Sequence, residues 1–191
     1  MVETEPAALK EWAVAVEALR SGRQILIMRK GGIREETRDF QVESESFYLF
    51  PTYEHQKKQW MKPEHQADLD KTLEGWSPQD TEVTIRCYAE LFEDILIADQ
   101  QQLNQLSEYH IWTDSFAEER LKWKRAKPLH VMLLRIYELS EPVRIPVVPE
   151  YNGCKSWIQL KDAALKEVRR KPVLSDAEFE AAVARIKSSL G

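Results

Sequence analysis

The chain has 191 residues, of which 43% are hydrophobic and 31% are charged, and its formal net charge is −5. This composition and length are typical of one globular domain and argue against long disorder, which requires low hydrophobicity together with high net charge. Because no apolar run approaches the roughly 20 residues of a membrane-spanning helix, residues 1–8 lack the pattern of a signal peptide, and two cysteines are too few for a disulfide scaffold, we expect a cytoplasmic protein with reduced thiols.

The first half of the chain predicts helices and strands in alternation with polar loops. Apolar residues three and four apart, followed by Gly22, predict an amphipathic helix from Ala7 to Arg20. Two apolar runs predict buried strands, Gln24 to Met28 and Phe47 to Phe50, and the polar stretch from Lys30 to Ser46 predicts a hairpin or a mobile loop. Pro63 to Leu73 reads as a helix that begins with proline in its first turn.

The middle of the chain predicts one strand and then two helices. Glu82 to Ile97 alternates in part and predicts a strand, or two strands joined at a bend. Asp99 is a suitable cap for a helix through Tyr109. A second helix is expected from Asp114 or Ser115 through Lys124, because Glu118 follows Ser115 at the spacing of a capping box.

The last third predicts strands and a final helix. Leu129 to Leu139 is the strongest strand, and the stretch that follows contains Pro142, Pro146 and Pro149, so it could serve only as an edge strand. Ser156 to Leu160 predicts one more short strand. Ser175 and Glu178 form a capping box for a helix whose apolar face holds Phe179, Val183, Ile186 and Leu190.

This order of elements indicates the fold class. Helix, strands, two helices, strands and helix do not alternate as βαβ units do, so we expect an α+β domain on a mixed or antiparallel sheet, with a curled barrel as one form of it. We place a single domain at residues 1–172 and a C-terminal helix at residues 173–191, which packs on that domain or on a partner. The oligomeric state stays open.

The first candidate segment for chemistry follows the strand that ends at Met28. Arg29, Lys30, Gly31, Gly32 and Arg34 combine cations with glycines that let backbone N–H groups approach a ligand, which would suit a phosphate. The segment matches neither the P-loop nor the dinucleotide fingerprint. A tight turn with solvated charges is the alternative.

The second candidate segment follows the strand that ends at Phe50. Thr52, Tyr53, Glu54, His55 and Gln56 place five different polar groups in a loop at the end of a strand, where binding groups are commonly displayed. His55 could act as a general base with Glu54, or it could have no role in chemistry. The spacing of the four histidines matches no metal-binding motif, so we expect no metal.

The third candidate segment surrounds an Asn-Gly turn. Tyr151, Asn152 and Trp157 bracket polar groups as a stacking platform would. Cys154 lies beside Lys155, whose charge favours a thiolate, although a small buried thiol is the alternative that we favour.

Charge and aromatic residues elsewhere leave further alternatives open. The region from Arg20 to Arg38 holds six basic residues and two acidic ones, which could form a basic face on an acidic chain or simply be solvated. The basic runs Arg120 to Lys127 and Lys161 to Lys171 could meet a phosphate backbone, but we favour solvated helix faces. Trp12 and Trp123 are assigned to the core.

Four stretches of these residues, ALKEWAVAVEAL, RKGGI, FYLFPTYEHQ and PEYNGCKSW, resemble the bacterial family known as domain of unknown function 1802. The resemblance runs in order from Leu9 to Leu160. It implies little about function. Some relatives are associated with a restriction endonuclease domain of the Mrr type, which implies a role near DNA restriction or modification, and here such a partner would be a separate protein.

A second resemblance concerns the fold. Residues 22–29 are similar to the G-x-K-x-x-E-x-R pattern of ASCH domains in the PUA-like superfamily, with Gly22 and Arg29 in register and with Gln24 and Ile27 as departures. Such domains are small β-barrels that hold RNA or modified bases in a cleft beside the first helix. The resemblance implies that Arg29 points towards that cleft.

These observations lead to a functional hypothesis that depends on long-range proximity. The three polar segments would line one cleft in a non-enzymatic recognition module for nucleic acid or a nucleotide-like ligand, without a cofactor. One alternative is a hydrolase or nuclease that uses Glu54 and His55. Another is an adaptor that docks a protein through the stretch from Tyr137 to Trp157.

Overall fold

A single mixed β-sheet organises the chain. The computed structural model describes residues 5–30, 40–123 and 127–191. The strand order is β2–β5–β4–β3–β1–β6, and β7 pairs with β5. The strands are β1 (Ala7–Trp12), β2 (Leu26–Arg29), β3 (Ser46–Thr52), β4 (Glu82–Ile97), β5 (Leu129–Pro146), β6 (Trp157–Gln159) and β7 (Arg170–Pro172). The pair β1–β3 is parallel and the other described pairs are antiparallel, which confirms the predicted α+β class with a mixed sheet.

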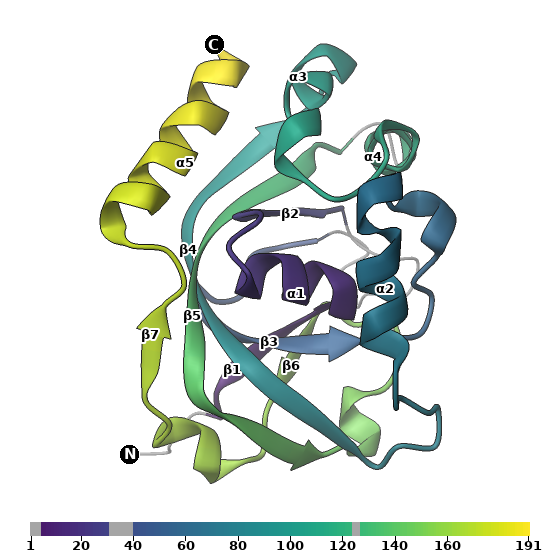
Figure 1. The fold of residues 1–191 in the computed structure, drawn as a ribbon, viewed down its shortest axis with the longest axis vertical. Helices are drawn as coiled ribbons and strands as arrows, with labels where there is room; N and C mark the ends of the chain where they lie inside the picture. Colours follow the sequence, from purple (N-terminus) through teal and green to yellow (C-terminus); the bar gives the residue numbers. More distant parts are fainter. Residues whose placement is uncertain (1–4, 31–39, 124–126) are drawn as a thin grey trace.

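The sheet curls because its two longest strands bend. β4 and β5 pair over most of their length, and the register shifts between Ile85 and Cys87 and again between Leu91 and Glu93. Such bulges increase the local twist and bend a strand. Figure 1 shows the resulting half-barrel, with the helix α1 (Ala13–Arg20) inside the curve of the long strands, between the sheet and α2 (Gln66–Leu73).

The N-terminal element differs from the prediction. The predicted helix from Ala7 to Arg20 is wrong in its first half, since β1 occupies Ala7–Trp12 and α1 begins only at Ala13. β1 pairs with β3 on one side and β6 on the other, and its residues Ala8 and Leu9 are both buried. Burial on both faces removes the alternation by which a strand is recognised in sequence.

The remaining helices share one hydrophobic core with α1, α2 and the sheet. They are α3 (Gln100–Gln105), α4 (Asp114–Lys122) and α5 (Asp176–Leu190), and short 3₁₀ turns occupy Lys58–Trp60, Pro63–His65, Ser107–Tyr109, Pro149–Tyr151 and Ala163–Lys166. The capping box of Ser175 and Glu178 is present, and α5 lies beside the ends of β4 and β5 (Figure 1). Its side chains Phe179, Val183 and Ile186 join the common core. The C-terminal helix therefore packs on the domain itself.

Two details of the second half correct the prediction. α4 is capped by Thr113, whose hydroxyl accepts a hydrogen bond from the Phe116 backbone at 3.2 Å, and not by a capping box at Ser115. Trp123, assigned to the core, is 44% exposed, since α4 ends one residue earlier. The cap at Asp99 is confirmed. Lys124 and most of the predicted loop from Lys30 to Ser46 lie outside the described residues.

Candidate functional site

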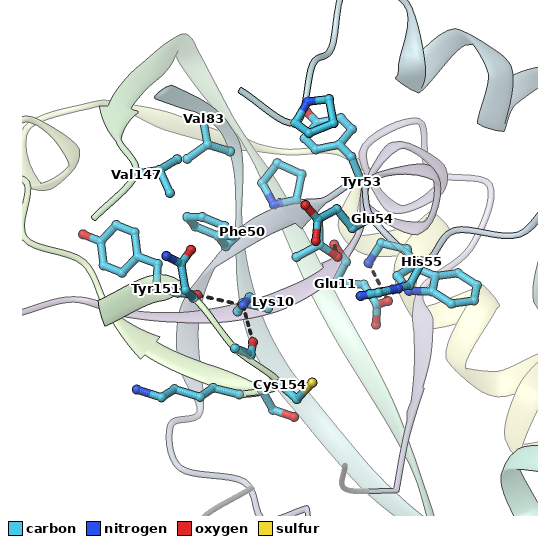
Figure 2. A pocket seen from close by; sticks show the side chains of 18 of the residues that line it. Lys10, Glu11, Phe50, Tyr53, Glu54, His55, Val83, Val147, Tyr151 and Cys154 are labelled. Atoms are coloured by element: carbon cyan, nitrogen blue, oxygen red, sulfur yellow. Dashed lines mark hydrogen bonds between the residues drawn. The ribbon is translucent and has the colours of Figure 1, made fainter. Parts of the chain in front are cut away.

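A cleft with a volume of about 520 Å³ lies at one edge of the sheet (Figure 2). We call it the edge cleft. Its walls come from residues 10–12 of β1, 29–30 at the end of β2, 50–55 at the end of β3, the segment 76–83 before and within β4, Arg120 of α4, Val147, and the loop 151–156 before β6.

The sheet topology explains why these segments meet. β1 and β3 are parallel, and Trp12 lies opposite Thr52, so the carboxyl ends of both strands reach the same edge. β6 runs antiparallel to β1, which brings the residues just before it to the same level, where the Lys10 N–H donates to the Ser156 carbonyl at 2.8 Å. Described residues of all three predicted polar segments therefore lie around one hollow.

Arg29 bridges the two ends of the curled sheet at this cleft. β2 and β6 lie at opposite ends of the strand order, yet Arg29 at the end of β2 donates to the Lys10 carbonyl at 3.1 Å and to the Ser156 hydroxyl at 2.5 Å. One Nη1–Oε2 distance of 3.5 Å also joins it to the buried Glu11. Arg29 points into the cleft region and contributes to closing the sheet.

Lys10 anchors the loop on the opposite wall. Its ammonium donates to the carbonyls of Tyr151 at 2.7 Å and Gly153 at 2.9 Å, and both bonds appear as dashed lines in Figure 2. Gly153 has a φ of +92°, which favours glycine. Partial burial lowers the pKa of Lys10, with nearby Lys155 and Arg29 acting in the same direction.

Arg120 adds a third cation to this part of the cleft. It comes from α4, its guanidinium lies 5.1 Å from the centre of the Phe116 ring, and no described residue accepts a hydrogen bond from it. Burial first, and then the charge of Arg29, lower the pKa of Arg120, while Glu11 opposes them. Glu11 is the one buried carboxylate among the described lining residues, so it faces three cations.

Aromatic and apolar side chains line the rest of the cleft. The Tyr53 and Trp76 rings stack with centroids 5.3 Å apart and planes 16° apart. Burial raises the pKa of Tyr53. Figure 2 shows Val83 and Val147 on the other side of Phe50 from Lys10 and Cys154. The edge cleft thus has a cationic part and an aromatic part.

The proposed catalytic pair has little support from its surroundings. Glu54 and His55 both line the cleft and are exposed. His55 adopts a φ of +69°, an uncommon conformation for a residue with a side chain, which turns the chain after β3. Within the described ranges, the imidazole has no hydrogen bond or ion pair to orient it, whereas a general base is usually held by a third group.

The structure separates several predicted site residues from the cleft. Gln56 turns away and bonds to the backbone of α1. Trp157 is a buried core residue whose indole donates to the Gln41 carbonyl at 2.8 Å. Gly31, Gly32 and Arg34 lie outside the described residues.

Four other predicted residues do line the cleft. They are Lys30, Thr52, Asn152 and Cys154. Lys30 is buried and donates to the Leu121 carbonyl, and the Thr52 hydroxyl donates to the Glu11 carbonyl at 3.1 Å. The expectation of a buried thiol at Cys154 is wrong, because that residue is exposed.

Sequence reasoning missed Lys10, Glu11 and Arg120. The first two were hidden by the prediction of a helix over β1. Arg120 was noted within a basic run but was assigned to a solvated face. A half-buried arginine beside Phe116 in a short helix has no distinctive local pattern, so only the three-dimensional fold reveals its place.

Neither a metal cluster nor a membrane span is found in the part of the chain that the structure describes. No three His, Cys, Asp or Glu side chains of residues 5–30, 40–123 and 127–191 gather as metal ligands would. Among the same residues, no helix has the length and apolar character needed to cross a bilayer.

Comparison with known proteins identifies the family. The profile described as "Domain of unknown function (DUF1802)" matches residues 8–185, so the chain belongs to this family, as the sequence resemblance predicted. No curated protein matches the chain. Two solved structures are similar: ASCH from Zymomonas mobilis, with 12% identity and a TM-score of 0.48 over 85% of this chain and 95% of that one, and a mutant form of ZmASCH from the same organism, with 10% identity and a TM-score of 0.45 over 96% and 98%. Both carry the ASCH name that the second resemblance indicated.

Proposed function

We propose that this member of the DUF1802 family is a recognition module that binds nucleic acid or a nucleotide-like ligand in the edge cleft. The observation that carries the proposal is the unequal charge around Glu11. Lys10, Arg29 and Arg120 converge on one buried carboxylate, and an anionic group of a ligand would balance the remaining positive charge.

The aromatic part of the cleft supports the same proposal. A base can stack on an aromatic face whatever its sequence, and each such contact contributes about 1–3 kcal/mol. The Tyr53–Trp76 pair lines the same hollow as the cations. A phosphate and a base are the two chemical groups that such a combination suits.

The alternatives receive less support. A hydrolase with Glu54 and His55 would need an orienting partner for the imidazole, and no described residue provides one. An adaptor would need an exposed apolar patch between Tyr137 and Trp157. Val147 is the one large hydrophobic residue recorded as exposed in that described stretch, and it lines the cleft. A separate restriction-type partner stays a prediction from the family resemblance.

A binding titration tests the proposal. We expect labelled single-stranded RNA or DNA to bind at low salt and to bind more weakly at moderate salt, because phosphate contacts release counterions. Arg120→Gln should weaken binding, whereas Arg144→Gln, which removes an exposed charge from β5 outside the cleft, should not. Arg29 is unsuitable as a first variant, since it also bridges the sheet. No binding of any nucleic acid or nucleotide at low salt would refute the proposal.

A further inference from the structure

We infer that the edge cleft binds a single nucleotide unit, a nucleoside monophosphate that is either free or the 5′-terminal residue of a strand, and does not bind the interior of a strand. This inference rests on the proposed function and narrows it. It assigns the phosphate to Arg120 in the cationic part of the cleft and the base to the Tyr53–Trp76 pair.

The size of the cleft is the first argument. Its volume of about 520 Å³ lies within the range of roughly 300–1,000 Å³ that is usual for small-molecule sites. Folds that bind single strands without sequence preference use grooves that follow about 4–16 nucleotides. A hollow of this volume accommodates one nucleotide more readily than such a run.

The arrangement of charge is the second argument. The cations do not form a stripe but converge at one place: Arg29 contacts Glu11 and the Lys10 carbonyl, and Arg29 and Glu11 both act on the charge of Arg120. Elsewhere the lining is acidic, with exposed carboxylates at Glu54, Asp80 and Glu82. One phosphate is favoured at the cationic place, and a second phosphate farther along the cleft would face carboxylates.

The bonding of the two guanidinium groups separates their roles. Arg29 already donates to a carbonyl and a hydroxyl, so it is a positioning residue that holds β1 and the loop before β6. Arg120 donates no hydrogen bond to a described residue and is held over Phe116. A planar guanidinium with uncommitted donors can hold a phosphate through two parallel hydrogen bonds.

The acidic side of the cleft fits the base. Tyr53 and Trp76 present their stacked rings near Asp80, whose charge acts on the Tyr53 phenol. Carboxylates accept hydrogen bonds from the N–H groups at the edge of a base. A ligand with an anion at one end and N–H donors on a planar ring at the other therefore complements the whole lining.

A length series tests the inference. The probes are the four nucleoside 5′-monophosphates, the matching nucleosides, and a 3-residue and a 12-residue oligonucleotide with and without a 5′-phosphate, each measured by calorimetry or by competition. We expect the best monophosphate and the 5′-phosphorylated strands to bind with similar affinity. Removing the phosphate should weaken binding about tenfold or more, as expected for the loss of charge-assisted hydrogen bonds.

Variants assign the phosphate contact. Arg120→Gln should abolish the difference between nucleotide and nucleoside, while Arg120→Lys should keep part of it and Arg144→Gln all of it. Thermal unfolding of each variant shows whether it is folded. If Arg120→Gln is not folded, Lys155→Gln at the exposed rim should reduce the same difference, since Lys155 lines the cleft.

The possible failures are distinguishable. Tighter binding of the 12-residue strand than of the monophosphates, with no effect of the 5′-phosphate, would overturn the single-nucleotide inference and leave the proposed function standing. An unchanged preference for nucleotide over nucleoside in folded Arg120→Gln would overturn the assignment of the phosphate. Absence of binding by every probe would overturn both proposals.

Discussion

The Gln56 side chain caps a helix that lies 42 residues earlier in the chain: its Oε1 accepts a hydrogen bond from the Val14 backbone N–H at 2.9 Å. α1 needs this partner because its own first residues supply no side-chain cap. The first N–H groups of any helix lack partners within it. The contact also fixes the loop after β3, which contributes Tyr53, Glu54 and His55 to the edge cleft.

Gln56→Ala should therefore destabilise the protein. We expect the free energy of unfolding to fall by about 1 kcal/mol, as for loss of a helix cap, when measured by urea denaturation. Gln101→Ala, an exposed position in α3, serves as the control and should have little effect. An unchanged free energy of unfolding in Gln56→Ala would show that the cap contributes nothing.

His110 should make the protein sensitive to acid. Its imidazole is buried, and burial together with the nearby charge of Lys62 lowers its pKa to about 4. In the unfolded chain the pKa is about 6.5, so the unfolded state binds the proton more readily. The stability that the neutral imidazole provides is complete above pH 6.5 and is lost as the pH falls towards 4, by about 3 kcal/mol in total.

Urea denaturation between pH 7 and pH 4 measures this loss. His110→Gln should remove a large part of the dependence on pH, because its side chain does not titrate. His55→Gln, at an exposed position, should retain the dependence. If the wild type and His110→Gln lose stability in parallel, the acid sensitivity has another source.

The elements that were predicted correctly are those with local determinants. The capping box of Ser175 and Glu178 and the cap at Asp99 depend on residues three apart, so their geometry can be read from the sequence. β1 was misassigned because its pairing with β3 and β6 is non-local, whereas its apolar spacing is compatible with a helix. Trp123 was misplaced because α4 ends just before it.

The candidate site divides in the same way. The loops that follow β2 and β3 could be predicted, because polar residues at strand ends are visible in the sequence. Arg120 and Lys10 could not, since their positions depend on the packing of α4 and on the curl that brings β2 to β1. Gln56 and Trp157 have the right residue types for a ligand site, but a helix cap and a buried indole use them instead.

Lys10 should stabilise the loop that forms one wall of the edge cleft. Its ammonium bonds to two carbonyls of that loop, and hydrogen bonds to charged groups contribute about 1.5–3 kcal/mol each. Lys10→Met removes both bonds and leaves the carbonyls to water. We expect faster hydrogen exchange of the backbone amides at residues 152–156, measured by mass spectrometry.

The control for this prediction is Lys171→Met on β7, an exposed lysine away from the cleft. It should leave exchange in the loop unchanged. Exchange that stays slow in Lys10→Met would mean that the bond from Arg29 to Ser156 and the pairing of β6 hold the loop by themselves.

The two cysteines should react very differently with a thiol reagent. Cys87 is fully buried in β4, and burial raises the pKa of its thiol to about 12, so almost no thiolate forms near neutral pH. Cys154 is exposed on the edge cleft. We expect one thiol to react rapidly with Ellman's reagent in the native protein and two in denaturant, with Cys154→Ser abolishing the rapid phase. Because Cys154 lines the proposed binding site, a bound nucleoside monophosphate should slow its labelling, whereas rapid labelling at saturating nucleotide would place the ligand elsewhere.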